Sequence, residues 1–93
     1  VYIFEDCCGA DGPLFSPSIY RSVFDEPYRK LISFYKDHDV KLALIDSDGR
    51  VEPFIPLWIE SGFDIIFPVE VGKWKASPVR LRKQFGSDLK MMG

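Results

Sequence analysis

Two aspartates separated by one residue, Asp46 and Asp48, follow an apolar stretch and precede Gly49. Residues 42–45 are apolar without a polar break, which is typical of a strand buried on both faces, and residues 46–49 indicate a polar turn. Alternate residues at a strand end point the same way, so both carboxylates could serve one site. The alternative is that one of them only caps a turn before the next helix.

Two more acidic positions end predicted strands. Glu5 and Asp6 follow the apolar start of the chain, and Glu70 follows a third apolar run. Because ligands bind at the carboxyl ends of parallel strands, we expect these residues to share one rim with Asp46 and Asp48. For each of them the alternative is a solvated carboxylate at a loop end.

The remaining reactive side chains have simpler explanations. Cys7 and Cys8 are adjacent, so a disulfide between them would be strained, and neither a second cysteine pair nor a positioned histidine accompanies them. We expect a structural role for both and a reducing compartment. His38 is predicted to end a helix, where a positive charge interacts favourably with the helix dipole. The basic and aromatic residues 73–75 are predicted to form an exposed loop.

The elements that must position these residues alternate regularly. Strands are predicted at residues 1–5, 41–45, 64–69 and 89–92, a loop at 6–16, and helices in the stretch after Ser16 and at 53–61 and 77–85. The order is β-α-β-α-β-α-β with short linkers, which predicts an α/β fold with parallel strands. Either a doubly wound sheet or part of a (β/α)8 barrel fits this order.

Local residue types mark where the helices begin and end. Ser16 and Ser77 each precede a proline, an arrangement that favours a helix start with the serine as N-cap. Gly62 is placed to end the second helix in the left-handed conformation. Pro27 predicts either a kink in the first helix or a second helix that has this proline in its first turn.

Composition narrows the class of protein. The chain has 93 residues, a hydrophobic content of 46% and a net charge of -2. These values are typical of one small globular domain and exclude a polybasic surface, so we expect no nucleic-acid partner and no membrane partner. No apolar run has the length of a membrane span, and the first residues do not have the pattern of a signal peptide. The predicted location is therefore cytoplasmic.

Three stretches in this order and spacing resemble the uroporphyrinogen decarboxylase superfamily, which includes corrinoid-linked methyltransferases. Shared features are the serine-proline helix start, a strand ending near serine-aspartate-glycine, a helix ending in serine-glycine and a strand ending in proline followed by glutamate. The stretches, which together span nearly the whole chain, are LFSPSIYRSVFDEPYRKLISFYKDHDVKLALIDSDG, IPLWIESGFDIIFPVE and LRKQFGSDLKMMG.

The resemblance implies that residues 1–93 are a fragment of a single (β/α)8 barrel domain, roughly its fourth to seventh strands. Such a piece has two open sheet edges, so we expect it to dimerise or to remain bound to missing barrel segments. The resemblance places the catalytic aspartate and tyrosine of the decarboxylase before this segment and its late histidine after it. The parent protein would then be a decarboxylating lyase acting on a tetrapyrrole without a cofactor, and the segment alone would be inactive.

The family positions also suggest alternatives. Asp46 and Asp48 fall where methyltransferases of the family carry a histidine and a cysteine that bind zinc, and carboxylates favour harder cations such as magnesium, calcium or manganese. Asp6 matches a small polar residue of the tetrapyrrole pocket, and Glu70 matches the glutamate after proline. A methyltransferase that uses a divalent metal or a corrinoid partner on a methylated compound is therefore one alternative, and a non-catalytic ligand-binding barrel is another.

Overall fold

Four parallel strands form the main sheet of the protein. The computed structural model describes residues 1–9, 11–70, 72 and 76–93. The strands of the sheet lie in the order β1-β4-β5-β6, and every neighbouring pair is parallel. They are β1 (Tyr2–Phe4), β4 (Leu44–Asp46), β5 (Ile65–Phe67) and β6 (Lys90–Met91). The predicted α/β class with a parallel sheet is confirmed, and β1 and β6 are the two edges of the sheet in the described chain.

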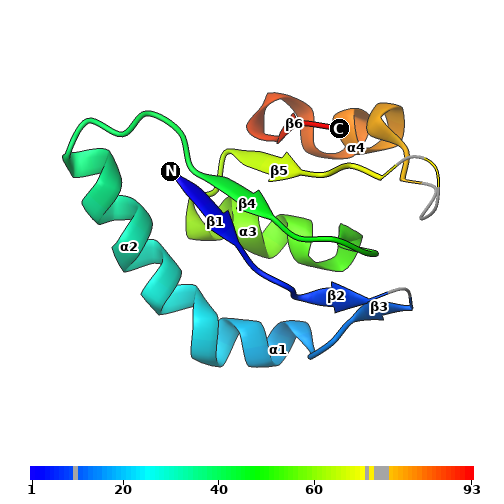
Figure 1. Cartoon of the computed structure of the whole chain (residues 1–93), viewed down its shortest axis with the longest axis horizontal. Helices are drawn as coiled ribbons and strands as arrows, with labels where there is room; N and C mark the ends of the chain where they lie inside the picture. Colours follow the sequence, from blue (N-terminus) through cyan, green and yellow to red (C-terminus); the bar gives the residue numbers. More distant parts are fainter. Residues whose placement is uncertain (10, 71, 73–75) are drawn as a thin grey trace.

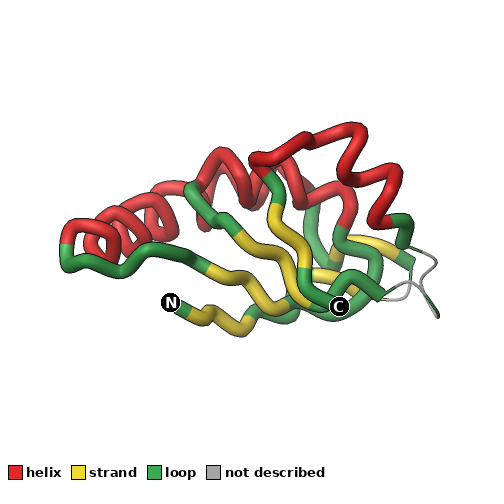
Figure 2. The backbone as a smooth tube through the Cα atoms, turned by 90° about the horizontal axis from the view of Figure 1, so that it is seen from above, coloured by secondary structure: helices red, strands yellow, loops and turns green. Residues whose placement is uncertain are grey.

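Helices cover one face of this sheet (Figures 1 and 2). They are α1 (Pro17–Ile19), a π-helical turn (Tyr20–Phe24), α2 (Asp25–Asp37), a 3-10 turn (Glu52–Phe54), α3 (Ile55–Ser61), α4 (Pro78–Phe85) and a second 3-10 turn (Gly86–Asp88). Each connection between neighbouring strands of the sheet contains at least one helix, as the predicted alternation of strands and helices requires. In the described part of the chain, no helix packs on the opposite face of the sheet (Figure 2).

The predicted helix boundaries depend on specific caps. The side chains of Ser16 and Ser77 accept hydrogen bonds from the backbone N–H groups three residues ahead, so both serines are N-caps followed by proline. Gly62 ends α3 with a φ of 111°, the left-handed conformation that glycine adopts at little cost. These boundaries are confirmed.

Pro27 lies in the first turn of a second helix, which is one of the two predicted alternatives. A π-helical turn joins α1 to α2, and Pro27 lies in the first turn of α2, where its missing N–H group needs no partner. The wider turn adds a residue between Tyr20 and Phe24, which keeps the rings of Tyr20, Phe24 and Tyr28 stacked along the core side at four-residue spacing.

A hairpin interrupts the stretch that was predicted to be a loop. β2 (Cys8–Gly9) pairs with the antiparallel strand β3 (Gly12–Pro13). Both strands have only two residues, too few to show the alternating pattern by which a strand is recognised in a sequence.

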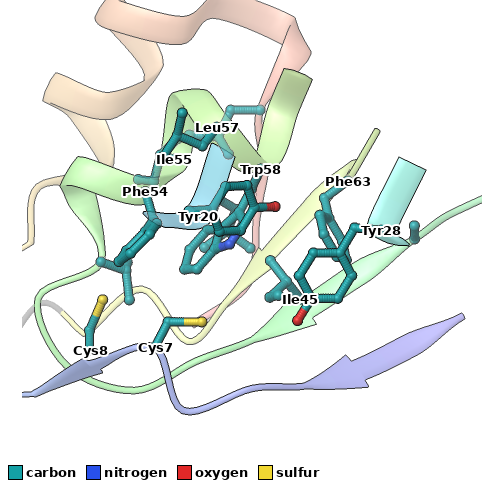
Figure 3. Close-up of a cluster of buried hydrophobic side chains, with 14 of the residues drawn as sticks. Cys7, Cys8, Tyr20, Tyr28, Ile45, Phe54, Ile55, Leu57, Trp58 and Phe63 are labelled. Carbon is teal, nitrogen blue, oxygen red and sulfur yellow. The ribbon is translucent and has the colours of Figure 1, made fainter. Parts of the chain in front are cut away.

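The core lies between the helices and the covered face of the sheet. Ile45 and Ile66 are in register and are 0% and 2% exposed. Above them lies an aromatic layer that includes Tyr20, Phe54 and Trp58 (Figure 3). Because strand residues alternate between the two faces, their neighbours point to the uncovered side.

The prediction of a strand buried on both faces was wrong. Leu42 is 43% exposed and Leu44 is only half-buried, since no helix lies over the second face. The strand also begins later than predicted, at Leu44. Among the described residues, no helix has the length and apolar character needed to cross a membrane.

Candidate functional site

Asp46 is the last residue of β4 and lies at the carboxyl end of the sheet. It is in register with Phe4 on β1 and with Phe67 on β5, so the three side chains share the face of the sheet that no helix covers. Phe4 is 62% exposed, whereas Asp46 is only 7% exposed. The carboxylate is therefore held between its neighbours on the open face.

Tyr2 holds this carboxylate in place. Its hydroxyl donates a hydrogen bond to Oδ2 of Asp46 from the adjacent strand. This hydrogen bond, followed by desolvation and by the negative charges of Asp46 and Asp48, raises the pKa of the Tyr2 phenol above its usual value. The phenol thus stays protonated at neutral pH and acts as a hydrogen-bond donor in a site with two carboxylates nearby.

Sequence reasoning did not identify Tyr2 as a site residue. The parallel register explains why Tyr2 reaches this site. Tyr2 pairs with Leu44 and therefore shares a face of the sheet with Asp46, two residues further along β4. A single sequence does not give this register, since the pairing depends on how the strands align in the folded sheet.

Backbone contacts fix the turn after β4. The amide N–H of Ser47 donates to the carbonyl of Phe67 at 2.9 Å, and its buried hydroxyl accepts from the N–H of Cys7 at 3.3 Å. The N–H of Glu5 donates to the carbonyl of Asp46 at 2.8 Å. The turn is thus tied to the strands on both of its sides.

Gly49 lets the hairpin approach this turn. Its φ of +92° is unfavourable for other residues, and a Cβ there would lie 2.7 Å from the carbonyl oxygen of Gly9 and 3.0 Å from that of Cys8. The next amide, of Arg50, donates to the Gly9 carbonyl at 3.2 Å. The sequence predicted a polar turn over residues 46–49, whereas Asp46 is the last residue of β4 and the chain bends at Gly49; the contact with the hairpin was not predicted.

The other predicted site residues lie in different surroundings. Asp48 and Asp6 are exposed in loops. Asp48 lies close enough to Tyr2 for its charge to affect the phenol. Glu70 is half-buried and lines a cavity together with Arg50. The structure therefore groups Asp46 and Asp48 around Tyr2 and places Glu70 in a separate site.

This cavity has a volume of about 470 Å³ and lies beside α3 and α4. Apolar side chains that include Ile55, Ile66 and Leu81 line it, and all three are almost completely buried. At its edge Arg80 makes an ion pair with both carboxylate oxygens of Glu52. Its size suits a small molecule, but its lining carries charges of both signs and favours no one class of ligand.

The cysteines do not add metal ligands to the rim. Cys7 and Cys8 are free and buried beneath Phe54 and Trp58 (Figure 3). Burial, with smaller effects from neighbouring acidic side chains, raises the pKa of Cys7 to about 12 and that of Cys8 to about 11. Both are therefore neutral thiols at pH 7, and metal binding requires the thiolate.

The donors near Asp46 are hard oxygen ligands. Across residues 1–9, 11–70, 72 and 76–93, no three or more histidine, cysteine, aspartate or glutamate side chains form a group that could hold a metal ion. A zinc site of the kind found in the methyltransferases does not fit these donors. Carboxylate oxygens favour harder cations such as Mg²⁺, Ca²⁺ or Mn²⁺.

The histidine lies where it was predicted. His38 follows α2, is exposed, and its Nδ1 atom lies 2.8 Å from the carbonyl oxygen of Phe34. Its ring also packs against the ring of Phe34. The predicted loop formed by Lys73, Trp74 and Lys75 lies outside the described residues.

Comparisons with known proteins give no relative for this chain. No protein-family model matches the sequence, and searches of curated proteins and of solved structures found no match. The geometry around Tyr2 and Asp46 and the sequence resemblance are therefore the basis for a functional proposal.

Proposed function

We propose that this chain forms part of the ligand-binding end of a uroporphyrinogen decarboxylase-like (β/α)8 barrel. The observation that carries this proposal is the hydrogen bond from Tyr2 to Asp46 on the uncovered face of a parallel sheet, where Asp46 is the last residue of β4. In a (β/α)8 barrel the helices form the outer ring, and ligands bind at the carboxyl ends of the strands. Asp46 lies at that end of β4, and Tyr2, the first residue of β1, reaches it along the uncovered face.

The composition of the open face supports the same architecture. Tyr2, Leu44 and Ile65 form one row across the strands, and Phe4, Asp46 and Phe67 form the next. A barrel interior is filled by layers of large apolar side chains from its strands, and these rows have that composition except at Asp46 and at Lys90 of β6, which is in register with Ile65. The single carboxylate at the carboxyl end is the exception that suggests ligand binding.

The surroundings of Asp46 favour a ligand that has N–H donors at its centre and apolar rings around them. Phe4 and Phe67 offer apolar rings on either side of a carboxylate acceptor. A reduced tetrapyrrole has pyrrole N–H groups surrounded by apolar ring edges, so its centre would place donors toward Asp46 and its rings over the phenyl groups. Tyr2 would keep one carboxylate oxygen occupied and leave the other for the ligand.

Two parts of the decarboxylase function are assigned to other segments of the barrel. The peripheral carboxylates of the substrate require basic residues, and Arg50 is the cation that follows the acidic turn. The proton donors implied by the family resemblance are not residues of this chain. The proposal therefore gives this chain a role in binding and orientation, and expects no decarboxylation by the chain alone.

A metal-dependent methyltransferase is the second candidate. It is favoured by the proximity of Asp46 and Asp48 to the same phenol, because their charges both raise the pKa of Tyr2. Asp46, Asp48 and the Tyr2 oxygen would hold a hard divalent cation, which would polarise a methyl acceptor. A cation bound there would require Tyr2 to give up or redirect its hydrogen bond to Asp46.

Binding of anaerobically reduced uroporphyrinogen tests the first candidate. Quenching of intrinsic tryptophan fluorescence should report binding to the chain, and Asp46→Asn should weaken it about tenfold or more, since hydrogen bonds to a charged group contribute about 1.5 to 3 kcal/mol. Asp88→Asn is the control, because Asp88 is exposed and precedes β6 at the other end of the sheet. Equal affinity of the wild type and the Asp46 variant would refute the assignment.

Titration with Mn²⁺, followed by its paramagnetic resonance signal, tests the second candidate. The wild type should bind one ion, and both Asp46→Asn and Asp48→Asn should abolish that binding. If the Asp48 variant binds Mn²⁺ as the wild type does, the metal site proposed for the methyltransferase is wrong.

A further inference from the structure

An apolar stripe runs along the outer side of the long helical segment formed by α1, the π-helical turn and α2. Its four large apolar members are between 40% and 57% exposed, although they occur at helical spacing on one segment. The stripe consists of Ile19, Val23, Pro27, Leu31, Phe34 and His38. Single exposed apolar residues are common, but a continuous row of them indicates an interaction surface.

The stripe lies on the flank of α2 that faces away from α3. Arg21 and Lys36 project from the other flank. There Arg21 makes an ion pair with Glu60 at 3.3 Å, and Lys36 makes one with Asp64 at 3.0 Å. Figure 1 shows α2 at the margin of the molecule, with no further helix beyond it. The apolar flank is therefore uncovered in the described chain.

The π-helical turn brings the two ends of the stripe into line. Ile19, Val23 and Pro27 are spaced by four residues, which in a regular α-helix would turn them progressively around the axis. The wider turn between Tyr20 and Phe24 compensates for that rotation. The stripe is thus nearly straight over its whole length.

We propose that this stripe binds the same stripe of a second copy of the chain, with the two helices antiparallel. The positions are almost symmetric about Tyr28 and Arg29, as an isologous contact requires. In the antiparallel arrangement each apolar residue of the first half meets an apolar or aromatic residue of the second. The pairs are Ile19 with His38, Val23 with Phe34, and Pro27 with Leu31.

Charges at the border of the stripe favour this orientation. Glu26 and Lys30 form an ion pair of 3.1 Å one turn apart along the helix. When the second helix is reversed about the same centre, Glu26 of each copy lies next to Lys30 of the other copy. A parallel arrangement would instead bring like charges together. The occupant is therefore a second copy in antiparallel orientation.

The proposed contact and the ligand site use different surfaces. In the barrel proposed above, a helix of the neighbouring unit would cover this flank of α2, so the dimer is proposed for the chain by itself. The stripe belongs to the helices that cover one face of the sheet (Figure 2), and the hydrogen bond from Tyr2 to Asp46 lies on the other face. Failure of ligand binding and failure of dimerisation would consequently be seen in different experiments and in different variants.

Sedimentation equilibrium of the full chain over a micromolar concentration series tests the proposal. The wild type should be a dimer, and Val23→Glu or Phe34→Glu should raise the dissociation constant at least about tenfold. Val79→Glu is the matched control, since Val79 is 67% exposed on α4 and should leave the dimer intact. Circular dichroism confirms that each variant remains folded.

A second control separates this contact from association through the open sheet. Phe4→Glu places a charge on the uncovered face and should not change the dimer. A monomeric wild type, or a dimer lost in Phe4→Glu and kept in Val23→Glu, would overturn the proposal. Glu26→Lys should weaken the dimer, and addition of Lys30→Glu should restore it.

Disulfide cross-linking checks the antiparallel register. In a chain with Val23→Cys and Phe34→Cys, the two positions are about 16 Å apart along one helix, too far for a bond within a chain. Oxidation should give a covalent dimer, while Cys7 and Cys8 stay buried and protonated. A mixture without covalent dimer would contradict the register.

Discussion

Gly49 offers the sharpest test of how the acidic turn is held. Substitution by alanine would force a residue with a side chain to keep a φ of +92°, which costs about 1 to 2 kcal/mol. The new Cβ would also lie 2.7 Å from the carbonyl oxygen of Gly9. Relief of that clash requires the hairpin to move away and weakens the hydrogen bonds that join it to Ser47 and Arg50.

The expected loss of stability is about 3 kcal/mol. Backbone strain gives about 1 kcal/mol of it, and two hydrogen bonds at about 1 kcal/mol each give the rest. Equilibrium urea unfolding followed by tryptophan fluorescence measures this loss. With a slope of about 1 kcal/mol per molar urea, the midpoint should fall by about 3 M.

Gly86→Ala is the matched control. Gly86 also has a positive φ, 61°, but a Cβ there would meet nothing within 4 Å. The control should therefore lose only the strain contribution, about 1 to 2 kcal/mol. If the two variants unfold at the same urea concentration, the close approach of the hairpin does not hold the turn, and the reasoning is wrong.

Three further predictions concern the core and the helix ends. The hydrogen bond from the Ser61 hydroxyl is the main cause that lowers the pKa of Asp25. The Asp25 carboxylate therefore stabilises the fold above about pH 4, and this contribution is lost as the pH falls through the pKa that Asp25 has in the folded state. Ser61→Ala should reduce this loss, as urea midpoints measured across acidic pH would show. Cys7 and Cys8 should not react with a thiol reagent at pH 8 until urea unfolds the chain, because their pKa values are about 12 and 11; rapid native-state reaction, followed by absorbance, would contradict their burial. Ser77→Ala removes the cap of α4 and should cost about 1 kcal/mol in urea unfolding, and an unchanged midpoint would show that the cap is unimportant.

The sequence determined the parts of the fold that depend on local chemistry. Ser16, Ser77 and Gly62 predicted helix ends because capping involves only a few neighbouring residues. The alternation of strands and helices predicted the parallel sheet because short linkers leave few other connections. The hairpin at Cys8–Gly9 and Gly12–Pro13 was missed because its strands are too short to show a pattern.

The candidate site was only partly predictable. Asp46 was selected from its place after an apolar run, and the structure puts it at the carboxyl end of β4. Tyr2 was not selected, although it donates the hydrogen bond that fixes the carboxylate. Glu70 was expected beside Asp46, but it lines a cavity next to α4.

Sequence alone therefore predicted the end of each strand to within one or two residues, and the tertiary structure decided which side chains near those ends meet. Strand ends follow from local composition and turn residues, which a single chain displays directly. Which face a side chain takes, and which neighbour it meets there, depends on register between strands that are far apart in the sequence. The pairing of Tyr2 with Leu44 sets that register and brings a phenol from the start of the chain to Asp46, 44 residues away.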